Sequence, residues 1–353
     1  MDILIVNHRN IYHPQAGGAE TVLYEIGRRL AKKAYVTWLA ESISGKNSQQ
    51  IIEGIRMKMK GNKYTLHLYS LMEAKKHEIV IDSIAHSVPF FSYKVNKNTV
   101  AMIHHVHQDV LRFEVNPLQA MFLRTLERGV RNYHRIIAVS KTTKRDLLKL
   151  GVNEEKIHVI YNGVDHGKYR PGEKSESPMI LWIGRMKKYK NPFDSLIIYK
   201  KLTKKVDMVV AGYGDLAEEF AKISKAIGVK YLGKVTEEEK IKLYQRAWIV
   251  LLTSYIEGWG MTVVEANACG TPVVAYATGS MPELISEGVN GFLVPYKDYN
   301  QAAKVIDAIL EENTIKQLSK MSLEESMKYS WEKTANEYMK YLSKLDIKQY
   351  RTV

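Results

Sequence analysis

Two glutamates in the segment EGWGMTVVEANACGTPVV (257–274) belong to the densest group of chemically useful residues in the sequence. Glu257 stands in a glycine-rich loop after an apolar run, and Glu265 lies about one turn into the helix predicted next. The amides that open this helix could hold phosphate or sugar oxygens; they belong to Gly260, Met261 and Thr262. A carboxylate accepts two hydrogen bonds at once, which suits sugar hydroxyls at one glutamate and a ribose diol at the other. The structural alternative is that Glu265 caps the helix and Glu257 lies on the surface.

A basic segment, GRMKKYKNP (184–192), follows the apolar run MILWI. It offers Arg185 and, five residues later, Lys190. Guanidinium and ammonium groups at the end of a strand suit a diphosphate leaving group, whose negative charge grows as its bond breaks. The alternative is a solvated basic loop.

The segment GGAE (17–20) places two glycines directly before a predicted helix. Without a Cβ atom, Gly17 and Gly18 would let the backbone come close to an anionic group at the helix N-terminus. The alternative is a flexible turn.

The segment GYGDLA (212–217) satisfies the glycine pattern of dinucleotide-binding proteins and makes an NAD-linked oxidoreductase the main rival interpretation. That interpretation also requires an acidic residue at the end of the next strand, to hold the ribose hydroxyls. The next strand ends instead in Gly233 and Lys234, which weakens the oxidoreductase interpretation.

Three histidines, His104, His105 and His107, stand at the end of another predicted strand. Neighbours on a strand point to opposite faces, so His104 and His105 cannot face one ligand in the same way. The sequence has no HExxH, no DxD and no cysteine partner for these histidines, and we therefore expect no metal site.

The fold class follows from short β-branched runs that alternate with longer helical patterns, which is typical of parallel α/β sheets. At 353 residues the chain is long enough for two domains. The boundary is predicted in the Gly-, Pro- and Ser-rich segment 162–178, giving domains 1–165 and 166–330 and a C-terminal helix in 331–353 that could cross back to the first domain. Strands are predicted at 3–6, 35–40, 78–83, 99–105, 135–140 and 157–162, and at 179–184, 206–212, 229–233, 248–254, 271–277 and 291–295.

The composition of the sequence bears on the cellular compartment of the protein. The N-terminus has no leader pattern, no long apolar run is present, and the single cysteine, Cys269, is expected to be a buried small side chain, so a cytoplasmic protein is predicted. The net charge is +14, of which residues 1–165 carry +9, with 24 Lys and Arg against 15 Asp and Glu.

A row of arginines in that basic half is predicted to lie along one helix face, which is either an anion-binding surface or a solvated helix. The arginines are Arg124, Arg128, Arg131 and Arg135.

The ordered set of motifs resembles the retaining glycosyltransferases of the GT-B fold, the fourth family of the sequence classification (glycosyl transferases group 1). The resemblance covers nearly the whole chain. It rests on GGAE, the strand-end histidines, AVSKTTKRDLLKLGV (138–152), IHVIYNGVD (157–165), IGRMKKYKN, AGYGDL, the glutamate pair, GSMPELI (279–285) and NGFLV (290–294). It implies two Rossmann-like, doubly wound parallel-sheet domains facing across a cleft, the first on the acceptor side and the second binding the nucleotide sugar.

Carried over residue by residue, the resemblance gives each motif a role. Arg185 and Lys190 would grip the diphosphate, and Glu265 would bind the ribose. Glu257 and the following amides would hold the sugar, with His104, or else His105 or His107, beside the anomeric carbon. The remaining donor-binding residues are Gly17, Gly18, Gly184 and Gly212, together with Gly260, Met261 and Thr262.

The family retains anomeric configuration, by front-face displacement in its usual account and by double displacement through Glu257 in a minority account. The resemblance implies a UDP- or GDP-linked donor and neither a cofactor nor a metal. This chain departs from many relatives at Gly279, Ser280 and Met281, where those have two glycines before Pro-Glu, so the sugar contacts are expected to differ. A GT-B-like sugar-nucleotide epimerase and a non-catalytic sugar-nucleotide sensor stay open beside the oxidoreductase.

The acceptor implied is a glycan or a lipid-linked glycan, for protein or envelope glycosylation, and no nucleic acid. Relatives that glycosylate lipids approach the membrane through basic and apolar surface of the N-terminal domain. Because each Lys or Arg near an anionic bilayer adds about 1 kcal/mol, the arginine row leads us to expect peripheral contact with the inner face of the membrane.

Overall fold

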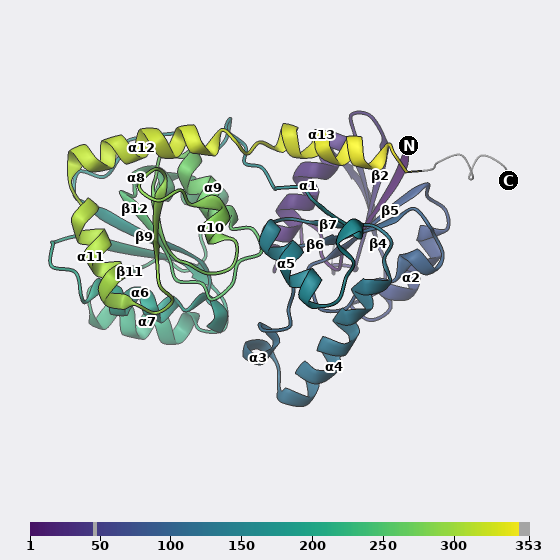
Figure 1. Ribbon diagram of the computed structural model, residues 1–353, viewed down its shortest axis with the longest axis horizontal. Helices are drawn as coiled ribbons and strands as arrows, with labels where there is room; N and C mark the ends of the chain where they lie inside the picture. Colours follow the sequence, from purple (N-terminus) through teal and green to yellow (C-terminus); the bar gives the residue numbers. More distant parts are fainter. Residues whose placement is uncertain (45–47, 346–353) are drawn as a thin grey trace. The chain divides into compact units, whose positions relative to one another are not determined.

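The β-branched runs of the sequence form strands in two separate sheets, each covered by helices (Figure 1). The computed structural model describes residues 1–44 and 48–345. One unit consists of residues 1–162 together with the helix that begins at Trp331, and the other of residues 163–330. The doubly wound, mainly parallel α/β fold predicted from the sequence is confirmed in both units.

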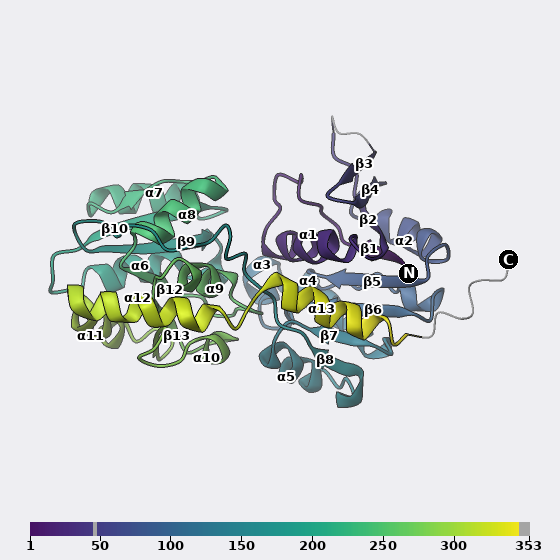
Figure 2. The ribbon, with the colours of Figure 1, turned by 90° about the horizontal axis from the view of Figure 1, so that it is seen from above.

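The N-terminal sheet has eight strands in the order β3-β4-β2-β1-β5-β6-β7-β8, which Figure 2 shows from its upper to its lower edge. All neighbours pair in parallel except β3 with β4. The strands are β1 (Asp2–Val6), β2 (Tyr35–Ala40), β3 (Gln49–Ile52), β4 (Ile55–Met59), β5 (Ile79–Ile84), β6 (Thr99–Ile103), β7 (Ile136–Ala138) and β8 (Ile157–Val159).

The pair β3 and β4 was not predicted from the sequence. In β4 the side chains of Ile55, Met57 and Met59 are buried, and Arg56 between them is exposed. This alternation is the period of a half-buried strand, but lysines and arginine between the apolar residues make the segment resemble a polar connection.

The helices of this unit are α1 (Gly18–Leu30), α2 (Leu66–Ala74), α3 (Leu111–Glu114), α4 (Pro117–Glu127), α5 (Lys141–Lys149) and α13 (Trp331–Leu342), with single 3₁₀ turns η1 (Ser92–Lys94), η2 (Arg128–Asn132) and η3 (Glu154–Lys156). Helix α13 packs on α1, where Arg29 pairs with Glu332 at 2.8 Å.

The arginine row does not lie along one helix face, so that prediction is wrong. Helix α4 ends at Glu127, Arg128 and Arg131 lie in the tighter turn η2, and Arg135 lies beyond it. Arg124 donates Nε to the Gln108 carbonyl at 2.8 Å, and Arg135 donates to the Lys97 carbonyl at 2.8 Å. Arg128 and Arg131 are exposed, whereas Arg124 and Arg135 are half-buried.

The C-terminal sheet is entirely parallel, in the order β11-β10-β9-β12-β13-β14. Its strands, all predicted, are β9 (Met179–Arg185), β10 (Asp207–Tyr213), β11 (Lys230–Tyr231), β12 (Ile249–Leu252), β13 (Val273–Tyr276) and β14 (Gly291–Val294). The helices are α6 (Pro192–Tyr199), α7 (Ala217–Ala226), α8 (Glu237–Arg246), α9 (Met261–Ala268), α10 (Met281–Leu284), α11 (Tyr299–Ile309) and α12 (Glu312–Ser326), with the 3₁₀ turn η4 (Lys188–Lys190).

A buried carboxyl group, Asp82, fastens the middle of the N-terminal sheet to its covering segments. It accepts hydrogen bonds from the Tyr133 hydroxyl at 2.6 Å and from the Ser92 hydroxyl and amide at 2.7 and 3.0 Å. Burial raises the pKa of Asp82 to about 6, against the lowering effect of these hydrogen bonds. The next residue, Ser83, contacts His104, so this network also supports the histidine segment.

We expect Tyr133→Phe to lower the free energy of unfolding by about 1–3 kcal/mol, and by more near pH 8 than near pH 5. Because the folded pKa of Asp82 lies above its unfolded value, its favourable contribution is complete below the unfolded pKa and is lost as the pH rises through about 6. Without the Tyr133 hydroxyl the pKa of Asp82 rises further. The stabilising contribution of Asp82 is then lost over a range that extends to higher pH. Urea unfolding followed by circular dichroism measures the free energy of unfolding near pH 5 and near pH 8. Tyr93→Phe is the matched control, since its ring packs against Tyr133 with centroids 4.6 Å apart; equal losses in the two variants would contradict the assignment.

Candidate functional site

The carboxyl edge of the C-terminal sheet brings together the segments that the sequence singled out. Strands β9, β12 and β13 are parallel neighbours, so the loops that follow them emerge at the same edge. Arg185 ends β9, and the loops carry Lys190 after β9, Glu257 after β12 and Gly279 after β13. Residues up to 94 positions apart in the chain thereby meet at one edge of the sheet.

Lys190 and Glu257 form the central ion pair of this edge. Both side chains are largely buried, 17% and 16% exposed. Ser254 donates its hydroxyl to Oε1 of the same carboxylate at 2.8 Å. Burial disfavours the charge on Lys190, but the Glu257 carboxylate outweighs it and raises the pKa of the lysine. Lys190 is therefore a fixed cation at neutral pH.

The loop after β13 packs directly on Glu257. Gly279 has a φ of 54°, and a Cβ atom there would lie 2.6 Å from both the amide nitrogen and the carbonyl oxygen of Glu257. The amide of Ser280 donates to that carbonyl at 3.1 Å, and Thr278 donates its hydroxyl to the Ser254 carbonyl at 2.7 Å. A glycine is therefore required at Gly279, the first of the three residues at which this chain differs from many relatives. The serine that follows it is held in the loop by the hydrogen bond of its amide.

Helix α9 begins at this site with an open N-terminus. Its N-cap is Gly260, whose φ of 101° favours glycine and which has no side chain to accept from the first turn. The amides that open the helix are those of Met261 and Thr262. This end of the helix carries partial positive charge.

Glu265 is the second carboxylate and does not cap the helix. It is buried in α9, five residues beyond the N-cap, and it bonds two side chains of α8. Lys240 lies 3.2 Å from Oε2, and the Tyr244 hydroxyl donates to the same oxygen at 3.1 Å. Burial raises the pKa of Tyr244 well above its usual value, which keeps the hydroxyl protonated. No spacing pattern in the sequence points to these two partners, because α8 has the ordinary pattern of a surface helix.

Arg185 ends β9 and lies over the ring of Tyr213, 5.0 Å from its centroid. Lys234 lies at the same distance from that ring. Beneath them, β9 and β10 approach so closely that a Cβ atom on Gly212 would lie 2.0 Å from the Gly184 carbonyl oxygen. This contact requires a glycine at 212, whereas a Cβ atom on Gly184 would only touch the Trp182 ring at 3.4 Å.

In the N-terminal unit, GGAE forms the start of α1. Gly17 is the N-cap and Gly18 the first helical residue. The Gly17 amide donates to the buried Glu20 carboxylate at 2.7 Å, and Glu20 also accepts from Asn7 at 3.0 Å. The Gly17 amide, which was predicted to face an anionic group, therefore already has a hydrogen-bond acceptor within the protein.

The three histidines differ in their surroundings. His104 follows β6 and is buried, with Nε2 3.0 Å from the Ser83 hydroxyl; burial, then His107, lowers its pKa to about 4. His107 holds Glu127 with Nδ1 at 3.1 Å and meets the Ala85 carbonyl with Nε2 at 3.2 Å, which is a structural role. His105 is half-buried and packs on His107, with centroids 3.9 Å apart.

Within residues 1–44 and 48–345, no group of three or more His, Cys, Asp or Glu side chains has the arrangement of a metal site. Cys269 is buried, as predicted, and burial followed by the nearby Glu265 raises the pKa of its thiol to about 12. It is a packing residue.

Two protein-family models match the chain, one for each half. Residues 167–329 match "Glycosyl transferases group 1", and residues 16–168 match "Glycosyltransferase Family 4". Among curated proteins, D-inositol 3-phosphate glycosyltransferase of Mycobacterium marinum is 31% identical over 51% of this chain and 43% of its own length. An uncharacterized glycosyltransferase of Methanocaldococcus jannaschii is 29% identical over 58% of both chains. The matches thus span about half the length of these relatives.

Solved structures with the same fold cover nearly the whole chain. Sucrose-phosphate synthase of Thermosynechococcus elongatus superposes with a TM-score of 0.79 over 97% of this chain and 98% of its own, at 18% identity. HepE of Anabaena, in complex with UDP and glucose, gives a TM-score of 0.79 over 98% of this chain and 100% of its own, also at 18% identity. These likenesses confirm the predicted GT-B fold class.

Proposed function

Since this chain belongs to the group 1 glycosyltransferases, we propose that it transfers a hexose from a nucleotide-diphosphate sugar to a glycan or lipid-linked glycan. The observation that carries the proposal is the carboxyl edge of the C-terminal sheet. There the fixed cation Lys190, the carboxylate of Glu257 and the open N-terminus of α9 occur together. Lys190 suits a diphosphate, and Glu257 with the α9 amides suits a sugar ring. Glu265, which lies in the same helix, suits a ribose.

The cations act on the leaving group. Arg185 and Lys190 stabilise the negative charge that develops on the nucleotide diphosphate as the bond to the sugar breaks. Because the pKa of Lys190 is raised, this charge is present throughout the neutral range. These two side chains can supply the positive charge for which other glycosyltransferases use a divalent ion, which supports metal-independent transfer. Gly184 and Gly212 are proposed to lie beside the phosphates, although the lack of a side chain at Gly212 is already required by the approach of β9.

The carboxylates bind hydroxyls. Glu265 is held by Lys240 and Tyr244 and is proposed to accept from the ribose diol. Glu257, with the amides of Met261 and Thr262, is proposed to hold the hexose. The glycines of GGAE are proposed to approach the donor phosphates through Gly18, since the Gly17 amide is engaged with Glu20.

Front-face displacement with retention is the mechanism we propose. Glu257 is paired with Lys190 and accepts from Ser254, and a carboxylate engaged in this way is a poor nucleophile for double displacement. The leaving phosphate oxygen then takes the acceptor proton. His104 is neutral at pH 7 because its pKa is about 4, so its proposed part beside the anomeric carbon is a hydrogen bond and not a charge.

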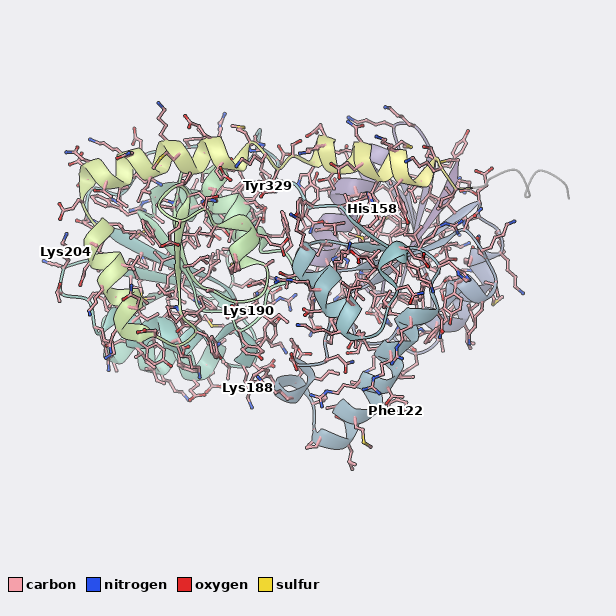
Figure 3. All side chains as sticks on the ribbon, viewed as in Figure 1. Phe122, His158, Lys188, Lys190, Lys204 and Tyr329 are labelled. Atoms are coloured by element: carbon pink, nitrogen blue, oxygen red, sulfur yellow. The ribbon has the colours of Figure 1, made fainter. Side chains whose placement is uncertain are left out.

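The acceptor is proposed to be presented at an anionic membrane surface. Helix α4, which lies apart from the sheet in Figure 1 and carries Phe122 in Figure 3, exposes three large apolar side chains. They are Leu118, Met121 and Phe122, which are 76%, 63% and 63% exposed. Exposed arginines flank them at Arg112, Arg128 and Arg131. No helix among the described residues is long and apolar enough to cross a bilayer, so contact of this kind would be peripheral.

Nucleotide binding can be tested by thermal shift with a panel that begins with UDP-glucose and GDP-mannose. A ligand at about 100 times its dissociation constant adds about 2.7 kcal/mol to stability. We expect one nucleotide sugar and its free nucleotide diphosphate to stabilise the protein. Glu265→Gln should reduce both effects, at about tenfold weaker affinity, whereas Glu238→Gln on exposed α8 should not. Unchanged affinity in the first variant would make Glu265 structural.

Arg185→Ala and Lys190→Ala should each lower turnover by about a hundredfold or more while the fold is retained, because each removes charge stabilisation of the leaving group. Lys188→Ala is the matched control, since Lys188 lies in the same turn η4 and is exposed; Figure 3 labels both lysines. Transfer to an added acceptor, with the anomeric configuration of the product read by NMR, is the measurement, with and without EDTA. Near-normal rates in both variants, inversion, or loss of activity in EDTA that magnesium restores would each contradict a part of this mechanism.

Co-sedimentation with liposomes tests the membrane surface. Binding should increase with anionic lipid and decrease with salt. Replacing the three apolar residues of α4 by serine should abolish it, because each contributes about 1.5–3 kcal/mol when buried. The matched control replaces Leu68 and Met72, which are 66% and 59% exposed on α2 of the same unit. Equal recovery in the supernatant with and without anionic liposomes would instead indicate an acceptor in solution.

A further inference from the structure

Glu265 belongs to a larger network of side chains on α8 and in the segment before β9. The Lys240 ammonium lies 3.2 Å from Oε2 and 3.3 Å from Oε1 of Glu265. The same ammonium lies 3.0 Å from Oε2 of Glu237, the first residue of α8. Lys240 is thus shared between two carboxylates, one of which has no part in the proposed transfer.

Tyr169 enters this network from the segment that begins the C-terminal unit, before the first strand of its sheet. Tyr169 is buried, and its hydroxyl donates to Oε1 of Glu237, which also accepts from Lys168 at 2.9 Å. The Tyr169 ring lies beneath Lys240, whose Nζ is 5.3 Å from the ring centroid. An ammonium is attracted to the face of an aromatic ring at this distance. Tyr169 therefore holds Lys240 both directly and through Glu237.

The charges of this network are fixed at neutral pH. Burial opposes the charge on Glu237, but Lys240 and the hydrogen bonds that the carboxylate accepts outweigh it and lower the pKa of Glu237 to about 2. Burial also opposes the charge on Lys240, but Glu265 and then Glu237 outweigh it and raise the pKa of the lysine. Burial, followed by Glu265 and Glu237, raises the pKa of Tyr169, so that its hydroxyl stays protonated and can donate.

Sharing of the ammonium keeps hydrogen-bonding capacity on one oxygen of Glu265. A carboxylate oxygen accepts about two hydrogen bonds. Oε2 is approached by Lys240 and accepts from the Tyr244 hydroxyl at 3.1 Å, whereas Oε1 meets Lys240 at the longer distance of 3.3 Å. Glu237 and the Tyr169 ring hold the ammonium back from closer pairing with Oε1. Without them Lys240 would compete for the oxygen that a ribose hydroxyl needs.

We propose that Tyr169 and Glu237 are positioning residues for nucleotide binding, which hold Lys240 so that Glu265 presents Oε1 to the ribose diol. This inference rests on the proposed function. Surface ion pairs add little to stability, and Lys168 and Glu237 are both exposed, so stability alone does not explain a network that ends on a buried carboxylate. A consequence is that the bound nucleotide is a ribonucleoside diphosphate. A nucleotide whose sugar lacks the hydroxyl that Oε1 binds gains nothing from Tyr169 and Glu237.

The experiment compares ribonucleotides with deoxyribonucleotides in the full-length protein. UDP, GDP and their 2′-deoxy and 3′-deoxy forms are titrated by calorimetry into the wild type and into Tyr169→Phe, which keeps the ring and removes the hydroxyl. We expect the variant to bind the preferred ribonucleotide about three- to tenfold more weakly, the loss expected for one hydrogen bond. One of the two deoxy forms should bind equally to both proteins, because it lacks the hydroxyl that Glu265 accepts from. A residue that only supported the fold would weaken all three nucleotides alike.

Glu237→Gln is the second variant, and since Glu237 is exposed its replacement leaves the core intact. It should show the same difference between the ribonucleotide and that deoxy form. The matched controls are Glu238→Gln, at the next position of α8, and Tyr199→Phe, whose hydroxyl donates to the Val206 carbonyl at 3.3 Å on α6 of the same unit. Both controls should bind every nucleotide as the wild type does.

The outcomes separate this inference from the proposed function. If the wild type binds a ribonucleotide but Tyr169→Phe and Glu237→Gln bind it equally well, or lose affinity equally for its deoxy forms, the positioning role is overturned and the donor site stands. If the wild type binds no nucleotide of the panel, the proposed donor site is contradicted and the positioning role is overturned with it. Combining Tyr169→Phe with Glu265→Gln gives a further check, since the double variant should bind no more weakly than Glu265→Gln alone.

Discussion

Parallel strand pairing is the constraint on which the rest of the molecule depends. Each parallel neighbour must be reached through a crossover, and so every strand end of a sheet opens into a loop at the same edge. In the C-terminal unit this brings Lys190, Glu257 and Gly279 together from three loops. In the N-terminal unit it does the same for His8, His86 and His104. Neither group is visible as a group in the sequence.

The lysine and hydroxyl partners of Glu257 and Glu265 then determine what each carboxylate can do. Glu257 and Glu265 both lie close to a lysine, Lys190 and Lys240, and each accepts a further hydrogen bond from a hydroxyl. The partners keep both groups as oriented acceptors, which suits binding of hydroxyls and opposes nucleophilic attack.

Patterns with a physical period were predictable, and contacts across space were not. The strands of the C-terminal sheet and six of the N-terminal strands could be predicted because buried parallel strands are short β-branched runs. The strand β4 was missed because charged residues interrupt its apolar face. The arginine row failed because helical spacing was assumed past Glu127, where α4 tightens into a 3₁₀ turn. Tyr244 and Ser254 could not be found at all, since no spacing rule connects them to the glutamates that they hold.

The positive charge of residues 1–165 comes from lysines and arginines and not from the histidines at the carboxyl edge of the sheet. Residues 1–165 carry a net charge of +9, yet His8 and His104 are neutral at pH 7, because burial lowers the pKa of each to about 4. Three of the exposed arginines of that half, Arg112, Arg128 and Arg131, lie around α4 and η2. A long-range field from these arginines can thus attract an anionic surface without any charge on the histidines.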